Sequence, residues 1–459
     1  MKTVHKYNSI ACFSATALVF CSSCLAGEIA VKSPVVPEVT TPAANPLSFG
    51  GGRFTFDIQE RMRMESRENT FDFNDAADSA TDDTWLLQRV RVGMKVKPSS
   101  GLSFYFQGQD AREFGSDRAN VPGVQGAEGD DPFDLRQAWV QVGGESGLSL
   151  RLGRQVLQYG DERLIGPLDW SNLSRTFDAA RLRYAAESWS LDLFTSSVVT
   201  IDGDGFNRSD WIDSDSNRDQ FFSGLYFSTT AVPAHTIDGY ALELHETAEV
   251  GDTDFVTLGL RIKADASKRN GWEYESEVAT QFGELQGLDL WTAAVHVGGG
   301  YAWLHSPWKP RLALEYNYGS GDGDPRDGED GTFQNLFPTN HKFYGAMDLF
   351  SWQNMHQPGV AMQATPISGL TVKVEYCVFW LADTEDAWYR ANGKTPVRPI
   401  TPDADAFAGS ELDVTINWKA ASWIGLSAGY SHFFAGKYLA ASGPNDDADF
   451  AFVMATLDF

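Results

Sequence analysis

The stretch that decides the fold runs Arg89-Val90-Arg91-Val92-Gly93-Met94-Lys95-Val96-Lys97. Every even-numbered residue in it is apolar, and every odd-numbered residue is basic or glycine. A side-chain period of two is typical of a β-strand whose two faces meet different surroundings. One face of this strand is therefore expected to meet an oily environment, and the other to meet water.

The same alternation recurs at 102–107, 256–263 and 411–418, and hardly any stretch has the apolar spacing of an amphipathic helix. A soluble β-sandwich would alternate in the same way, so strand length has to separate the two classes. Tilted membrane strands need about 9–11 residues, and about 18 segments of roughly 10 to 14 residues can be placed. They begin near residues 53, 85, 101, 133, 148, 177, 188, 219, 235, 253, 272, 289, 309, 358, 369, 409, 423 and 449.

The connections between these segments alternate between short and long. Short turns lie at 98–100, 143–147 and 420–422, whereas the long connections lie near 67–84, 111–132, 158–176, 200–218, 320–357 and 382–408. Tight periplasmic turns and long outside loops are typical of outer-membrane barrels. The sequence therefore predicts an all-β fold: a transmembrane antiparallel β-barrel of about 18 strands, with the long loops extracellular.

The two chain ends fit an exported barrel. Two lysines and an apolar run over 10–20 lead to a small-residue stretch, which predicts a signal peptide over 1–26. A lipid anchor on Cys21 or Cys24 is the alternative. The chain stops at Phe459 inside an alternating strand, which resembles the signal read by the barrel-assembly machinery. We therefore expect outer-membrane lipid and that machinery as partners, and the cell outer membrane as the location.

A proline-rich, nearly uncharged linker is expected over 27–48, and the barrel over 49–459. Without 1–26 the chain keeps 34 basic and 62 acidic residues, a net charge of −28, so no nucleic acid is expected as a partner. Only Cys377 remains, and no intramolecular disulfide can form.

Acidic residues concentrate in the long loops, whereas arginine is the commonest charged residue on the polar faces of the strands. Guanidinium groups offer forked donors that match carboxylates, so a basic lumen would favour anions. The alternative is that arginine and glutamate pair across strands and stiffen the wall. The expected pore lining is Arg61, Arg63, Arg89, Arg91, Arg136, Arg151, Arg181 and Arg183.

Two acidic loops imitate calcium sites. One carries Asp213, Asp215, Asn217 and Asp219, and the other runs over 322–328. The first has Gly224 where an EF-hand loop has its bidentate glutamate. Solvated loop charge is therefore the leading interpretation, and Ca²⁺ in the extracellular loops is the only cofactor considered.

One stretch carries a more specific pattern. It runs Gly153-Arg154-Gln155-Val156-Leu157-Gln158-Tyr159-Gly160-Asp161-Glu162-Arg163-Leu164-Ile165-Gly166, and Trp170, Asn172, Arg175-Thr176-Phe177-Asp178 and Arg181 follow it. It resembles the signature of the alginate-export family of outer-membrane proteins. The resemblance implies an 18-stranded barrel whose electropositive lumen passes an anionic polysaccharide or a related uronate.

This connection of about 20 residues is rich in charges and aromatic rings, so we expect it to fold into the lumen. Its charged residues are dense enough to form an ion-pair network, which would either serve transport or only brace the barrel. The expected members are Arg154, Asp161, Arg163, Arg175 and Asp178.

The leading hypothesis is an outer-membrane channel for acidic saccharides such as alginate. The alternatives are a less selective porin for small anions or sugars, and a non-transporting adhesin or structural barrel. An enzyme is not expected, because the eight histidines are scattered and no zinc-protease motif occurs.

Overall fold

The fold is almost entirely β-structure. The computed structural model describes residues 47–77, 82–116, 130–211, 220–247, 251–394 and 396–459. The expected signal peptide, most of the linker and all four residues of the first calcium candidate lie outside these ranges. Among the described residues, no helix has both the length and the apolar character to span a membrane.

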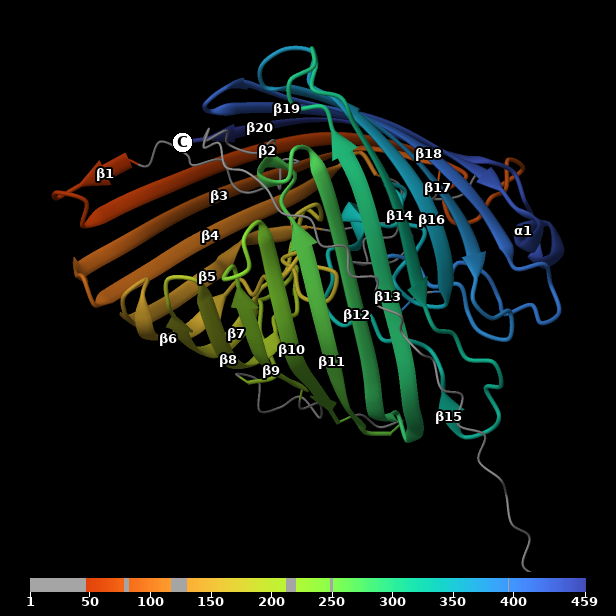
Figure 1. The fold of residues 1–459 in the computed structure, drawn as a ribbon, viewed down its shortest axis with the longest axis horizontal. Helices are drawn as coiled ribbons and strands as arrows, with labels where there is room; N and C mark the ends of the chain where they lie inside the picture. Colours follow the sequence, from red (N-terminus) through yellow and green to blue (C-terminus); the bar gives the residue numbers. More distant parts are fainter. Residues whose placement is uncertain (1–46, 78–81, 117–129, 212–219, 248–250, 395) are drawn as a thin grey trace, which may run out of the picture.

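Eighteen long strands make up the wall (Figure 1). They are β2 (Phe54–Glu68), β3 (Asp83–Ser99), β4 (Leu102–Phe114), β5 (Asp131–Gly143), β6 (Gly147–Gln155), β7 (Phe177–Ala185), β8 (Trp189–Val198), β9 (Gln220–Thr229), β10 (His235–Glu246), β11 (Thr253–Ala264), β12 (Trp272–Leu285), β13 (Leu288–Ala302), β14 (Arg311–Gly319), β16 (Met355–Ala364), β17 (Leu370–Leu381), β18 (Phe407–Ala421), β19 (Ile424–Ala435) and β20 (Ala448–Asp458).

Each of these strands pairs antiparallel with its neighbours in the chain, and β2 pairs with β20 to close the barrel. Gln59 lies opposite Asp458, and the backbone of Ile58 exchanges two hydrogen bonds with Phe459. Closure leaves no long sheet edge in contact with lipid. The predicted fold class is confirmed, and every predicted strand start lies within three residues of the observed one.

The alternation has the predicted consequence. On β3, Leu86 and Val92 are exposed on the outer surface, whereas Arg89 and Arg91 are buried on the inner one. The odd-numbered basic residues of the opening stretch therefore point into the barrel. The outer surface is apolar along most strands, as lipid contact requires.

Five small elements of the described residues were not predicted. The short strand β1 (Leu47–Phe49) pairs with Phe54–Phe56, so strand structure begins two residues before the expected boundary at Phe49. The strand β15 (Glu329–Asp330) adds to β13. The helix α1 (Lys437–Ser442) connects β19 to β20, and two 3₁₀ turns lie at Ala266–Lys268 and Asn340–Lys342.

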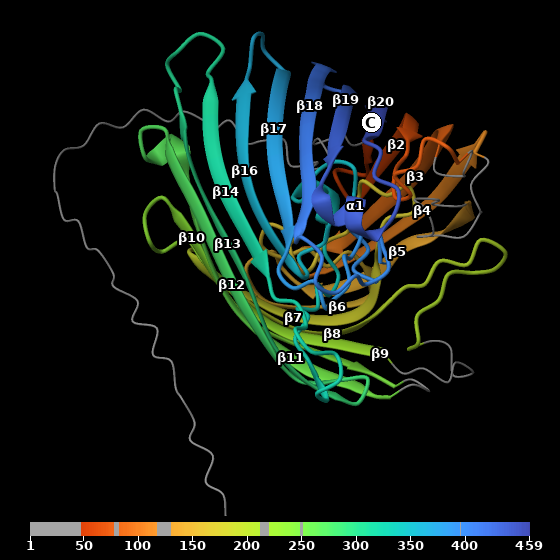
Figure 2. The same ribbon diagram turned by 90° about the vertical axis from the view of Figure 1, so that its right-hand side faces the viewer.

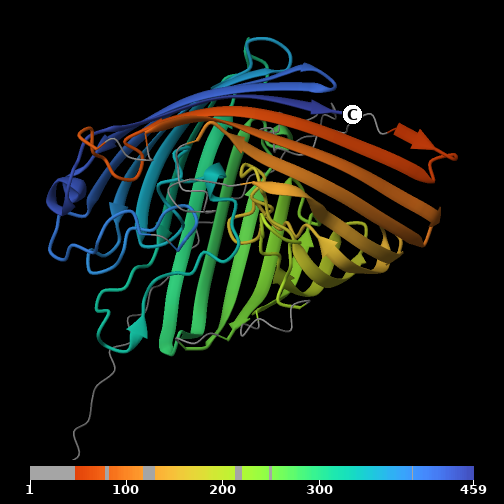
Figure 3. The ribbon, with the colours of Figure 1, turned by 180° about the vertical axis from the view of Figure 1, so that it is seen from behind.

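The two longest loops fold partly into the barrel, which was not predicted. Much of the chain over 331–354 lies inside the barrel, as Figures 2 and 3 show, and buried Trp388 stacks on Phe350 of this stretch. The side chains of Phe333, Tyr344 and Trp352 are fully buried. The aromatic rings of these loops explain the inward packing, since burying each ring removes a large apolar area from water.

Exposed basic residues of the extracellular connections should be accessible to protease. Trypsin added to intact cells should cut at Arg326, whose side chain is 83% exposed, and at Lys437, which is 77% exposed. Lys268 is 67% exposed in the short turn between β11 and β12 and serves as the internal control. It should be cut only after the outer membrane is permeabilised. Cleavage at Lys268 in intact cells would reverse the predicted topology.

Candidate functional site

The connection between β6 and β7 crosses the interior of the barrel, as predicted. Its residues Leu157, Ile165 and Asn172 are almost fully buried. Ile165 forms a parallel bridge with Phe337, and the Gly166 N–H donates to the Phe337 carbonyl over 2.8 Å. We call residues 156–176 the inner segment. Backbone hydrogen bonds join it to the buried stretch 331–354.

Gly166 is required by this close approach. A Cβ atom built on it would lie 2.2 Å from the Thr339 Oγ1 atom. Any other residue would push the two loops apart, since real Cβ atoms do not approach other atoms so closely.

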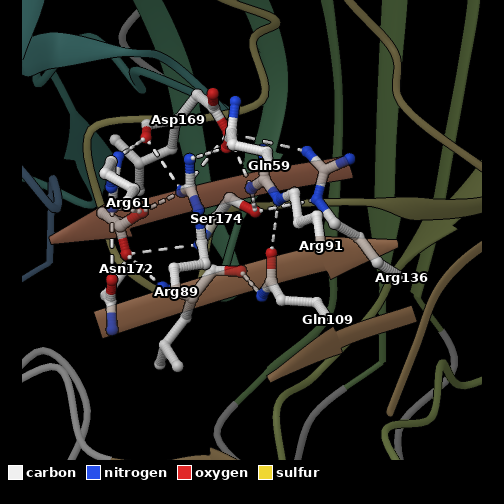
Figure 4. Close-up of polar contacts among 12 residues, drawn as sticks. Gln59, Arg61, Arg89, Arg91, Gln109, Arg136, Asp169, Asn172 and Ser174 are labelled. Atoms are coloured by element: carbon white, nitrogen blue, oxygen red, sulfur yellow. Dashed lines mark hydrogen bonds and ion pairs between the residues drawn. The ribbon is translucent and has the colours of Figure 1, made fainter. Parts of the chain in front are cut away.

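Arginines of the wall donate hydrogen bonds to backbone carbonyls of the inner segment (Figure 4). Arg61 on β2 donates to the carbonyls of Asp169, Trp170 and Ser171 at 2.7, 3.1 and 3.2 Å. Arg89 on β3 donates to the carbonyls of Asp169 and Ser171 at 3.1 and 3.0 Å. The forked guanidinium groups thus bind oxygen atoms from the chain itself.

The Asp169 carboxylate occupies the centre of this arginine cluster (Figure 4). Its Oδ1 atom lies 2.8 Å from Arg91, 3.5 Å from Arg89 and 3.7 Å from Arg136. Arg91 and Arg136 also donate to the Ser174 hydroxyl at 2.8 and 3.1 Å. Burial acts to raise the pKa of Asp169, but the three guanidinium groups outweigh it and hold that pKa well below its usual range.

A lowered native pKa stabilises the fold above the unfolded pKa, and this stabilisation is lost as the pH falls toward the native value. Wild type should therefore unfold at a higher temperature than Asp169→Asn at pH 7. The difference should shrink below about pH 4, by at most about 1.4 kcal/mol per pH unit. Thermal unfolding of both proteins across this range measures it. A difference independent of pH would show that the Asp169 charge contributes nothing.

The Trp170 indole contacts a guanidinium group and an imidazole ring. The Arg63 guanidinium lies 3.9 Å from the centre of the indole ring, and the His341 ring stacks on the indole at 3.8 Å with an interplanar angle of 9°. Arg63 also pairs with buried Glu65. The inner segment is therefore fixed by a cation–π contact and by stacking as well as by hydrogen bonds.

The remaining predicted lining arginines form a separate group. Arg151 on β6 lies directly opposite Arg181 on β7. The Arg151 guanidinium sits 4.0 Å from the ring centre of Trp139. Arg183 pairs with Asp192 at 3.2 Å and keeps 38% of its side chain exposed. Arg181 of this second basic group lies beside the Tyr159 hydroxyl of the inner segment.

The predicted ion-pair network is divided among separate places. Only Arg154 and Asp178 pair with each other, at 3.0 Å. By the alternation along β6 and β7, they project on the same side as Leu152 and Leu182, away from the lumen. Burial lowers the pKa of Arg175 to about 10, and its guanidinium donates to backbone carbonyls.

The other two members reach the opposite wall. Asp161 pairs with Arg261 at 2.7 Å and with Lys263 on β11. Arg163 lies 3.8 Å from Glu277 and 4.0 Å from the ring centre of Phe343. Arg261 and Glu277 lie directly opposite each other on β11 and β12, so Asp161 and Arg163 meet the wall at one place, whereas the Arg154–Asp178 pair lies between β6 and β7.

The charge of the wall is divided between its two sides. Arginines dominate β2 to β7, whereas β14 to β18 carry carboxyl groups on the inner face, among them half-buried Glu315 and buried Glu411 and Asp413. The Met347 N–H donates to Glu411 over 2.9 Å. The strand alternation placed Glu411 and Asp413 on the inner face, but no role was assigned to them.

The second calcium candidate is described. Asp322, Asp324 and Asp327 each accept a hydrogen bond from a backbone N–H two residues further along. Within the described part of the chain, no group of three or more potential ligands is placed to hold a metal ion. These carboxylates instead form local turns of the loop.

A closed antiparallel barrel with an apolar outer surface and a charged interior defines the class of outer-membrane transport barrels. The sequence model of the alginate export family matches residues 53–453. The chain therefore belongs to the alginate export family and is an outer-membrane protein. No curated protein matches the sequence.

Solved structures share the fold at low sequence identity. Pseudomonas aeruginosa OpdK, crystallised with vanillate, has a TM-score of 0.60 and 10% identity over 88% of this chain and 98% of its own. P. aeruginosa OccK9 (OpdG) has a TM-score of 0.60 and 13% identity over 88% and 98%. Acinetobacter baumannii OccAB4 has a TM-score of 0.58 and 13% identity over 89% and 98%.

Proposed function

We propose that the protein is a channel for anionic saccharides, such as alginate or related uronates, that pass the arginines of β2 to β7. The observation that best supports this proposal is the cluster in which Arg89, Arg91 and Arg136 surround the Asp169 carboxylate. A uronate presents the same carboxylate together with hydroxyl groups. Guanidinium groups bind both through directed hydrogen bonds.

The second candidate is a less selective pore for small anions. The division of charge across the wall favours it, because the carboxyl groups of β14 to β18 would repel a long polyanion. The vanillate bound by the fold neighbour OpdK is a small carboxylate and supports the same candidate.

Flux into proteoliposomes separates these candidates. Oligouronates and neutral oligosaccharides of the same length should be compared, with a small monocarboxylate as a third solute. The proposal expects the oligouronate to enter fastest. Entry of the monocarboxylate alone would favour the second candidate, and equal rates for charged and neutral chains would contradict both. Absence of any flux would support a structural barrel.

A further inference from the structure

Four polar side chains lie on the lipid-facing surface of β2 to β4. By strand alternation, Glu60 shares its face with Met62, which is 46% exposed. Gln88 on β3 and Asp110 and Arg112 on β4 lie on the same outer face. The register places Glu60 beside Val90, Val90 beside Asp110, and Gln88 beside Arg112. We call these four residues the outer polar patch.

The members of the outer polar patch contact one another. Gln88 donates to Glu60 over 2.8 Å, and Arg112 pairs with Asp110 at 2.8 Å. The Arg112 and Asp110 side chains remain 34% and 29% exposed. Both charges therefore keep hydrogen-bonding capacity that faces away from the barrel.

Apolar residues lie on both sides of the outer polar patch along the strands. Toward the long loops are Met64, Leu86 and Phe114, which are 49%, 37% and 49% exposed. Toward the periplasmic turns are Val92 and Phe106, which are 43% and 47% exposed. The charges thus lie within the apolar belt, where lipid chains offer them no hydrogen bond.

An apolar groove adjoins the patch on the same surface. It encloses about 510 Å³ and is lined by Phe56, Val92, Met94, Phe106 and Phe133, among others. Phe133 is 67% exposed at its edge. A lipid chain could fill the groove but could not satisfy the neighbouring charges.

We propose that a second copy of this chain docks on the outer polar patch and groove. The patch is self-complementary, because it holds an arginine and an amide donor together with two carboxylates. A two-fold axis along the membrane normal keeps each residue at its own depth in both copies. Arg112 of one copy then meets Asp110 of the other, and the second pair forms in the same way. The exposed phenylalanines of the two copies then make apolar contacts with each other around the polar patch.

Cysteine cross-linking in native outer membranes tests the proposal. Met62→Cys places a thiol beside the patch without altering it, in a Cys377→Ala background that removes the buried native cysteine. Val297→Cys on β13 is the matched control, with 49% exposure on a distant part of the outer surface. A short bis-maleimide should give a homodimer at position 62 at least about five times more often than at position 297.

A second variant tests the charges. Glu60→Leu, Asp110→Leu and Arg112→Leu together replace the three charged members of the patch by residues that suit lipid. The barrel should therefore still fold, and heat-modifiable mobility on gels checks this. In this background the homodimer at position 62 should fall to the level at position 297. Equal cross-linking at the two positions, a dimer unaffected by the leucines, or an adduct with a different protein would each overturn the proposal.

Discussion

Excising residues 168–174 should raise the single-channel conductance by about two-fold or more, because the inner segment fills part of the lumen. The Arg175 N–H donates to the Pro167 carbonyl over 2.6 Å, so the ends of the excised stretch already meet. Two glycines can join them without strain. The excision removes Asp169 and Trp170 and frees the guanidinium groups that hold them.

The excised protein should also become more anion-selective, since the Asp169 charge no longer offsets Arg89 and Arg91. Planar-bilayer recording measures both effects. Asp169→Asn is the matched control, because it removes the charge and keeps the bulk of the segment. It should raise anion selectivity with little change in conductance. Unchanged conductance after excision would place the narrowest part of the pore elsewhere.

Replacing Arg151, Arg181 and Arg183 together by glutamine should lower the anion-to-cation permeability ratio by roughly two- to three-fold. Arg151 and Arg183 donate to Gln141 and Asp192 on the wall, so the barrel interior should keep its structure. Fixed charge acts over about 8 Å at physiological salt, which favours groups on the wall over acids in wide loops. The reversal potential in a salt gradient gives the ratio.

The lysine variant at the same three positions is the control for this experiment. It keeps the charge and removes the forked donor geometry, so its reversal potential should remain close to that of wild type. Binding of a uronate should weaken in both variants. If the glutamine variant keeps the wild-type reversal potential, this group does not set the selectivity.

Most of the wall could be predicted from the sequence, because alternation with a period of two is a local property. The stretch around Arg89 shows this, since its neighbours alone determine which side chains point inward. The inner segment was also predicted, from its length and its density of charges and rings. The inward position of 331–354 was missed, although its buried aromatic residues were a visible signal.

The candidate site was harder to predict, because its contacts join residues far apart in the chain. Arg61 and Asp169 meet through a hydrogen bond that spans 108 positions. The spacing of the signature did not show that Asp161 and Arg163 would reach partners on the adjacent strands β11 and β12. Asp169 itself was overlooked, although it immediately precedes Trp170 in the signature. The outer polar patch was visible as charges on apolar faces, at Glu60 and Arg112.

We expect the lumen to conduct anions in preference to cations although the chain is strongly acidic. The most direct test is the reversal potential of the unmodified protein in a planar bilayer, with a ten-fold KCl gradient at pH 7. We expect the sign of this reversal potential to show a preference for anions. A potential of the opposite sign would show that the carboxyl groups of β14 to β18 and the acidic loops determine the ion selectivity, and that the lumen does not prefer anions.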